Sequence, residues 1–455
     1  MRYGRGLTAK ADGTRVRLFP QPSFLPRRRQ PETVLLSPRA GSVGPGPADS
    51  RMYVVRAIGK PHPYGLVESL GGAPPFPYFP PWDGPIRPPA FPAPGGHLDH
   101  LPAGSPEFEL AHVYGVARLV LDVWEGYLGR PIRWHFVSDY EKLEISILRG
   151  FDNARAGYGF LEIGEEMRRT VPVPLFSYNF DIVAHEVGHL IIFSSVGLPD
   201  PEQHTDEYHG FHESAADVVA LLAAASFASV VDELFDRTRG NLYVPNELNR
   251  FAELTEQEQI RVASNPARLR DFAAGWDDEH DLSLPLTGAF FDILVDLFHE
   301  NLLDRGLLDP VVEDLADRFE YEPAAGRLIQ ALFDRAYPAN AAAFREAFAD
   351  ARDLLGVYLA RCWRRLRGDP VTYAGVMSEF LAVDREATGG RYARLIRNNA
   401  HYRDIGRVEV GPRLTPPDAR SHVGSVRTII PKEAPSPQHN RTAPAVTAGI
   451  VGRPS

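Results

Sequence analysis

The stretch DIVAHEVGHLIIF, residues 181–193, decides the interpretation of this chain. Its apolar residues predict a largely buried helix, on which His185 and His189 lie four positions apart and therefore on one face. Two imidazoles at this spacing can bind a single tetrahedral cation. Glu186 follows the first histidine and lies beside such a cation, where a carboxylate can accept a proton from water. The stretch therefore predicts a metal site with an adjacent general base.

An open catalytic zinc site needs a third protein ligand, and Glu213 is the candidate. It lies in FHESAAD, residues 211–217, within a second predicted helix at 211–227 that continues with apolar residues. Glu213 and Asp217 share one face of this helix, and a buried carboxylate pair without a cation or a proton is costly. We predict that Glu213 binds zinc and that Asp217 hydrogen-bonds to His185. The alternative is a glutamate favoured by the helix dipole and an aspartate paired with an arginine.

These two segments resemble the gluzincin metallopeptidases, and most closely the thermolysin and fungalysin groups. The resemblance covers roughly residues 107–300 by motif and is strong only at the zinc ligands. It implies a zincin-like fold, zinc as cofactor, and a peptide or protein as substrate. It also implies roles for five residues: zinc ligands His185, His189 and Glu213, general base Glu186, and supporting carboxylate Asp217.

The same resemblance suggests further site residues. Asn153 and Ala154 resemble the start of the edge strand that binds the substrate backbone in these enzymes. The family's transition-state histidine lies in a His-x-Asn-Ser-Gly turn that this sequence lacks, and His280 is the nearest candidate. Tyr208 is the candidate for the other oxyanion donor. For both of these residues the alternative is an ordinary polar side chain in a loop.

The sequence also departs from the family pattern. The gap between His189 and Glu213 is a few residues longer than usual, and His212 stands where asparagine is common. Calcium is common among the relatives, so Ca²⁺ is a possible second ion, but no residue can be assigned to it.

Composition and the order of segments predict an α+β protein with two lobes, because 455 residues exceed one ordinary core. We expect a Pro/Gly-rich, partly disordered extension at 1–106. Its proline- and aromatic-rich stretch 74–94 is expected to lie along a folded surface, and the alternative is a partner-binding motif. A zincin-like domain follows at 107–410, with a sheet-containing N-lobe at about 107–227 and a helical C-lobe at about 228–410. Strands are expected at 132–136, 143–147 and 158–163. Residues 411–455 are expected to form a disordered tail.

Charge and hydropathy limit the partners. A net charge of −10 does not favour nucleic acid as a partner. The sequence shows no uninterrupted apolar run of the length that a membrane span needs, and its arginine-containing start does not resemble a signal peptide. We therefore expect a cytoplasmic protein without a membrane partner, although export without a cleaved signal stays open. The sequence does not predict the oligomeric state.

The sequence favours hydrolysis of peptide bonds by a zinc-activated water with Glu186 as general base, and an endopeptidase over an exopeptidase. Two other hypotheses remain open at this point. In the first, the chain binds zinc but has lost efficient catalysis and serves as a binding or structural module. In the second, the helical half is an interaction scaffold and the motif is fortuitous.

Overall fold

The computed structural model describes residues 12–22, 30–67, 76–151, 153–165, 176–200, 204–243, 250–253, 259–319, 323–368 and 370–414. Helices predominate over strands, in a mixed α+β fold with small sheets. The strands are β1 (Gly13–Leu18), β2 (Glu32–Arg39), β3 (Met52–Arg56), β4 (Gly65–Val67), β5 (Phe76–Tyr78), β6 (Leu143–Arg149), β7 (Ala154–Gly157), β8 (Phe160–Glu165), β9 (Arg250–Glu253) and β10 (Gln259–Val262). The α-helices are α1 (Pro106–Leu128), α2 (Phe180–Ser195), α3 (Glu207–Ala224), α4 (Ala228–Thr238), α5 (Glu279–Asp304), α6 (Val311–Phe319), α7 (Pro323–Trp363), α8 (Tyr373–Thr388) and α9 (Ala393–Tyr402).

The largest sheet has four strands in the order β3-β6-β8-β7. Strand β6 pairs in parallel with β3 and β8, whereas β7 pairs with β8 in antiparallel fashion and forms one edge. Helix α1 packs against β3, and α2 packs against β7 and β8. The apolar residues Ile145, Ile147, Leu161 and Ile163 are buried. The sheet therefore holds α2 beside its edge strand.

The folded region begins earlier in the chain than the predicted boundary near residue 107. Strand β3 belongs to the four-stranded sheet, and the β1-β2 pair packs on α1. Gly115 of α1 permits this close approach, because a Cβ atom there would lie 2.6 Å from the side chain of Leu18. The proline-rich stretch also packs where it is described, since the backbone N–H of Trp82 donates to Glu144 of β6.

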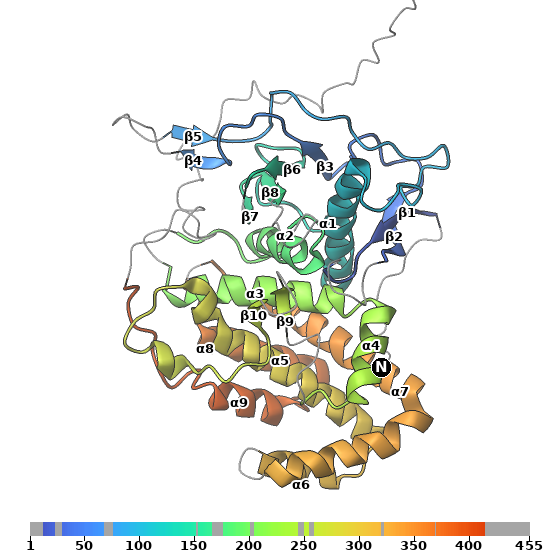
Figure 1. Ribbon diagram of the computed structural model, residues 1–455. Helices are drawn as coiled ribbons and strands as arrows, with labels where there is room; N and C mark the ends of the chain where they lie inside the picture. The colour runs from blue at the N-terminus through green and yellow to red at the C-terminus, as the bar shows by residue number, and fades with distance from the viewer. Residues whose placement is uncertain are drawn as a thin grey trace, which may run out of the picture.

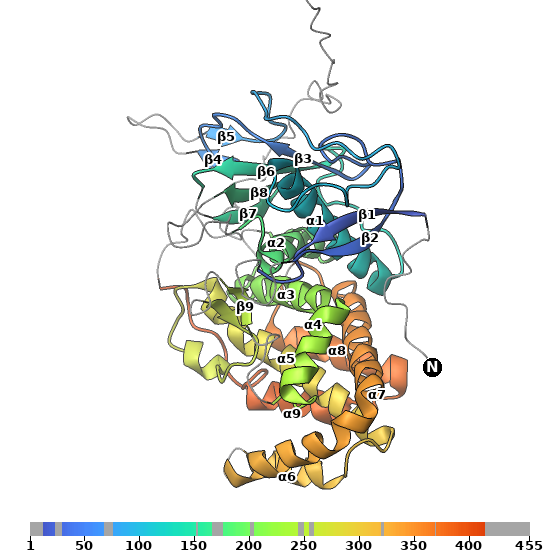
Figure 2. The same cartoon turned by 45° about the vertical axis from the view of Figure 1, so that its right-hand side comes forward.

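Helices α2 and α3 lie side by side in the middle of the molecule (Figures 1 and 2). The strands β1–β8 and α1 lie on the α2 side, and helices α4–α9 lie on the α3 side. Gly188 makes the contact close, because a Cβ atom there would lie 2.8 Å from the Cα of Ala216. The two predicted motif helices are therefore neighbours in space as well as in sequence.

Helix α5 is a core helix. In the described part of the chain it is long and apolar enough to cross a membrane, and the bent pair α3 and α4 meets the same criterion only when counted together. However, 83% of the most apolar 18-residue stretch of α5 is buried inside the molecule. An all-round apolar helix in that setting is typical of a protein core.

Several predicted boundaries were wrong. Residues 132–134 are irregular and 135–139 form turns, so no strand is present there, although Ile132, Trp134 and Phe136 are buried as the alternation indicates. Helix α3 begins at Glu207 rather than at residue 211. The strands near 143–147 and 158–163 are confirmed as β6 and β8. Residues 411–414 of the predicted tail are ordered against Trp276, and most of that tail lies outside the described residues.

Candidate metal centre

Helix α2 carries three of the predicted site residues. Its N-cap is Asn179, whose side chain accepts hydrogen bonds from the backbone N–H groups of Asp181 and Ile182 at 3.1 and 3.3 Å. This cap starts the helix five residues before the first candidate ligand. The side chains of three residues beyond the first turn are buried polar groups: His185, Glu186 and His189. Burying three such groups is costly unless they bind something.

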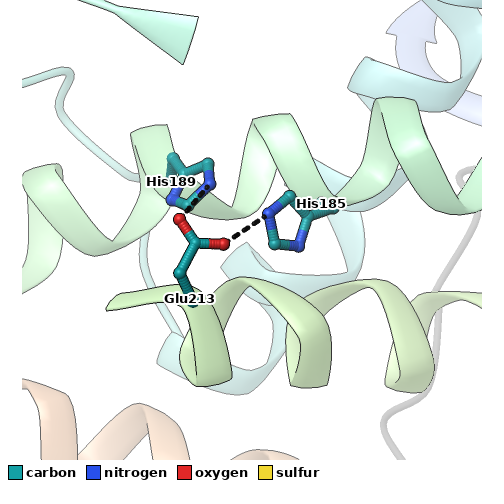
Figure 3. A group of neighbouring side chains, drawn as sticks. All are labelled: His185, His189 and Glu213. Atoms are coloured by element: carbon teal, nitrogen blue, oxygen red, sulfur yellow. Dashed lines mark ion pairs between the residues drawn. The ribbon is translucent and has the colours of Figure 1, made fainter. Parts of the chain in front are cut away.

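Glu213 of α3 points at both histidines (Figure 3). Its Oε2 lies 3.2 Å from His185 Nε2, and its Oε1 lies 3.6 Å from His189 Nε2. One ligand atom from each of the three residues lies within 4.8 Å of the other two. Among the described residues, these three form the one group of histidine, cysteine or carboxylate side chains close enough together to hold a metal ion. The candidate metal-binding triad is therefore assembled from the two helices.

The donor set and its spacing fit a zinc ion. Tetrahedral ligands at about 2.1 Å from zinc are separated from each other by roughly 3.4 Å. The two oxygens of Glu213 each lie near this distance from one imidazole nitrogen, Oε2 at 3.2 Å from His185 and Oε1 at 3.6 Å from His189. Two imidazoles and one carboxylate also leave a fourth position for water, as in catalytic zinc sites. The spacing does not by itself distinguish zinc from other divalent transition metals.

Asp217 fixes the orientation of His185. Its Oδ1 lies 2.9 Å from His185 Nδ1, and both side chains are buried. An Nδ1–H group that donates to this carboxylate leaves the lone pair of Nε2 directed at Glu213 and thus at the metal position. The predicted pairing of Asp217 with His185 is present in the structure.

His212 has the corresponding place beside His189. The Nδ1 atoms of the two rings lie 2.7 Å apart, and the rings stack with an interplanar angle of 5°. If His189 keeps its Nε2 lone pair for a metal, its Nδ1 carries the proton and donates it to Nδ1 of His212. His212 is then neutral, with its own proton on Nε2. The sequence marked His212 as a departure from the family pattern but did not predict this contact.

His280 lies at the same site, from the first turn of α5. Its Nε2 is 3.4 Å from Glu213 Oε2, and its side chain is 30% exposed. On the other side of the ring, Nδ1 lies 2.7 Å from Oδ1 of Asp278, which also caps α5 by accepting from the backbone N–H of His280. This hydrogen bond from His280 is the main cause of the lowered pKa of Asp278. The carboxylate thus orients an imidazole at the open side of the triad.

A C-terminal segment holds the loop that precedes His280 and the start of α5. The backbone of Trp276 bonds to Pro412 and Leu414 at 3.2 and 2.8 Å. The guanidinium of Arg413 lies over the Trp276 ring and donates to Glu279 at 3.1 Å. Glu279 is the neighbour of His280 in the sequence. No signal in the sequence pointed to this connection, because its partners are separated by more than 130 residues.

Tyr208 lies beside His212, and the predicted substrate strand lies at the sheet edge next to α2. Tyr208 is fully buried, and its ring centroid is 5.7 Å from that of His212. Asn153 precedes β7, where its side chain accepts a hydrogen bond from the backbone N–H of Ala154 at 2.8 Å. Ala154 is the first residue of β7, the edge strand against which α2 packs. The structure thus places Asn153 and Ala154 on the sheet edge beside the triad helix.

Comparison with known proteins does not assign this chain to a family. No protein-family model matches the chain, and no curated protein matches its sequence.

Proposed function

We propose that this protein is a zinc-dependent peptidase with a zincin-like fold. The observation that carries the proposal is the buried triad of His185, His189 and Glu213 with Glu186 next to the first ligand on α2. In this proposal the four-stranded sheet with α1, α2 and α3 forms the N-lobe, and the helices after α3 form the C-lobe. The presence of His280, oriented by Asp278, favours a catalytic site over a purely structural metal site.

The residues of this chain would share the reaction as follows. When bound, zinc supplies a Lewis acid that polarises a peptide carbonyl and acidifies a water molecule. Glu186 takes the proton from the attacking water and returns it to the leaving nitrogen. His280 donates to the carbonyl oxygen as negative charge develops on it. We assign this donation to His280 rather than to Tyr208, because Tyr208 is fully buried against His212.

The substrate would bind as an added strand. In the described part of the chain, β7 pairs with β8 and no strand pairs with its outer edge. An extended peptide can hydrogen-bond to such an edge and place one of its carbonyl groups beside the neighbouring helix α2. This mode suits an endopeptidase, since it needs no free end of the substrate chain.

The test compares zinc content and hydrolysis of casein or quenched fluorescent peptides in three full-length proteins. These are the wild type, Glu186→Gln, and Glu313→Gln, the last as a matched control at an exposed site on α6. We expect about one zinc per chain in all three. Hydrolysis is expected in the wild type and the control, and a loss of at least 100-fold in Glu186→Gln.

Two other results would contradict the proposal in different ways. Zinc in all three proteins without hydrolysis would favour the hypothesis of a zinc-binding protein that has lost catalysis. Absence of zinc from the wild type purified from zinc-containing medium, and no uptake on titration, would remove the metal site itself.

A further inference from the structure

Arg155, the second residue of β7, carries an inference that the sequence did not suggest. Strand β7 is the sheet edge that packs against α2. Its side chains alternate in direction, and Ala154 and Ala156 are buried in the core. Arg155 therefore faces the opposite side of the sheet, where Glu162 of β8 is its cross-strand partner.

The carboxylate of Glu162 is already held by other groups. Lys60 donates to its Oε1 at 2.6 Å, and the backbone N–H of Tyr64 donates to its Oε2 at 2.9 Å. Lys60 and Glu162 are both almost fully buried. The Nε of Arg155 is 3.9 Å from Glu162, which is an ion pair beyond hydrogen-bond distance.

The second carboxylate on this face, Glu144 of β6, is satisfied as well. It accepts from the hydroxyl groups of Tyr53 and Tyr64, both at 2.7 Å, and from the backbone N–H of Trp82 at 2.9 Å. The charges of Glu144 and Glu162 therefore neutralise those of Lys60 and Arg155, but the carboxylate oxygens already accept hydrogen bonds from other donors. Within the residues that the structure describes, Arg155 makes no hydrogen bond to either carboxylate.

The guanidinium of Arg155 is only slightly exposed to water, and the described residues offer its Nε no acceptor. Its side chain is 14% exposed, and its Nε is buried without a hydrogen-bond partner in the described part of the chain. The Phe160 ring lies below it at 5.6 Å. Burial lowers the pKa of Arg155, and the charges of Glu162 and Glu186 act against that effect. Arginine in such a place favours a carboxylate, which can accept two parallel hydrogen bonds.

We propose that Arg155 binds a carboxylate side chain, Asp or Glu, of a peptide that lies along the free edge of β7. The inference rests on the proposed peptidase function and adds a substrate class to it. Residues of an added strand alternate between the two faces of the sheet, so one of them lies opposite position 155 on the face of Arg155. Strand β7 packs against α2, the helix that carries Glu186, so the added strand would lie beside the proposed site.

The experiment measures binding rather than turnover, so that it does not depend on catalysis. Dye-labelled octapeptides carry Glu or Gln at one position at a time in an otherwise fixed sequence. Fluorescence anisotropy gives their affinity for the full-length, zinc-loaded Glu186→Gln protein. The same peptides are tested with Arg155→Gln, Arg155→Lys and, as control, the exposed Arg364→Gln, each introduced into that protein.

We expect one peptide position at which Glu binds about tenfold more tightly than Gln. This ratio should fall to about one in Arg155→Gln, recover in part in Arg155→Lys, and stay unchanged in Arg364→Gln. A ratio that is the same with and without Arg155 overturns the inference, and so does the absence of any preference for Glu. Hydrolysis by the wild type without such a preference would leave the proposed function intact, which separates the two failures.

Discussion

His189 and His212 face each other through their Nδ1 atoms at 2.7 Å, one ring on each of the two helices that form the candidate metal centre. The contact requires that one nitrogen donates and the other accepts. A donor on His189 leaves its Nε2 lone pair toward Glu213, so His212 sets the tautomer of a candidate ligand.

The first prediction concerns the identity of this acceptor. In His212→Asn an amide oxygen can accept from His189 in place of the imidazole nitrogen, so zinc affinity should stay within a few-fold of the wild type. In His212→Leu the acceptor is lost, and zinc affinity should fall about 10- to 100-fold. Competition with a zinc-binding dye measures both values. Equal affinity in His212→Leu and wild type would show that this contact does not orient the ligand.

The sequence predicted the triad because the ligands on α2 and α3 follow helical periodicity, which depends only on local spacing. It predicted the burial of Trp134 and Phe136 but assigned them to a strand. Alternation shows which side chains are buried, whereas a strand also needs a backbone partner, and residues 132–136 are irregular or in turns instead. Long-range contacts were missed for a related reason. Nothing near Arg413 in the sequence indicates its contact with Glu279, and nothing near Arg155 indicates its ion pair with Glu162.

The second prediction concerns His280. Removal of its imidazole in His280→Ala should leave zinc content unchanged and lower kcat about 100- to 1,000-fold with little change in KM, because the donation matters mainly in the transition state. The matched control is His401→Ala at an exposed position on α9. Unchanged kcat would remove His280 from the mechanism, and loss of zinc would instead make it a metal ligand.

The third prediction concerns the close contact of α2 and α3. In Gly188→Ala the new Cβ would lie 2.8 Å from the Cα of Ala216 and 3.1 Å from its carbonyl oxygen, so the helices must move apart. We expect a loss of about 1 to 3 kcal/mol in stability and weaker zinc binding, since the ligands come from both helices. Thermal unfolding with and without added zinc measures both effects. Gly95→Ala is the control, because its Cβ would meet only an ordinary contact at 3.6 Å; equal behaviour of the two variants would contradict the prediction.

The last prediction concerns acid stability and follows from His112 in α1. Burial lowers the pKa of His112 to about 4, below its ordinary value of 6.5. The unfolded chain therefore binds a proton first as the pH falls, so the stability contributed by the neutral ring is complete above about 6.5 and is lost between 6.5 and 4. His135 and His299 act in the same direction, since burial lowers the pKa of each to about 3.

The variant His112→Asn tests this effect, because an amide N–H can replace the ring Nδ1 that contacts the carbonyl of Ser177 at 2.9 Å without titrating. Between pH 7 and pH 5 it should lose about 2 kcal/mol less stability than the wild type, as measured by urea unfolding at both pH values. The exposed His401→Asn should lose as much as the wild type. The comparison uses the change with pH within each protein, so a lower stability of His112→Asn at pH 7 does not affect it. An equal pH-dependent loss in His112→Asn and wild type would mean that the ring takes up its proton at the same pH in the folded protein as in the unfolded chain.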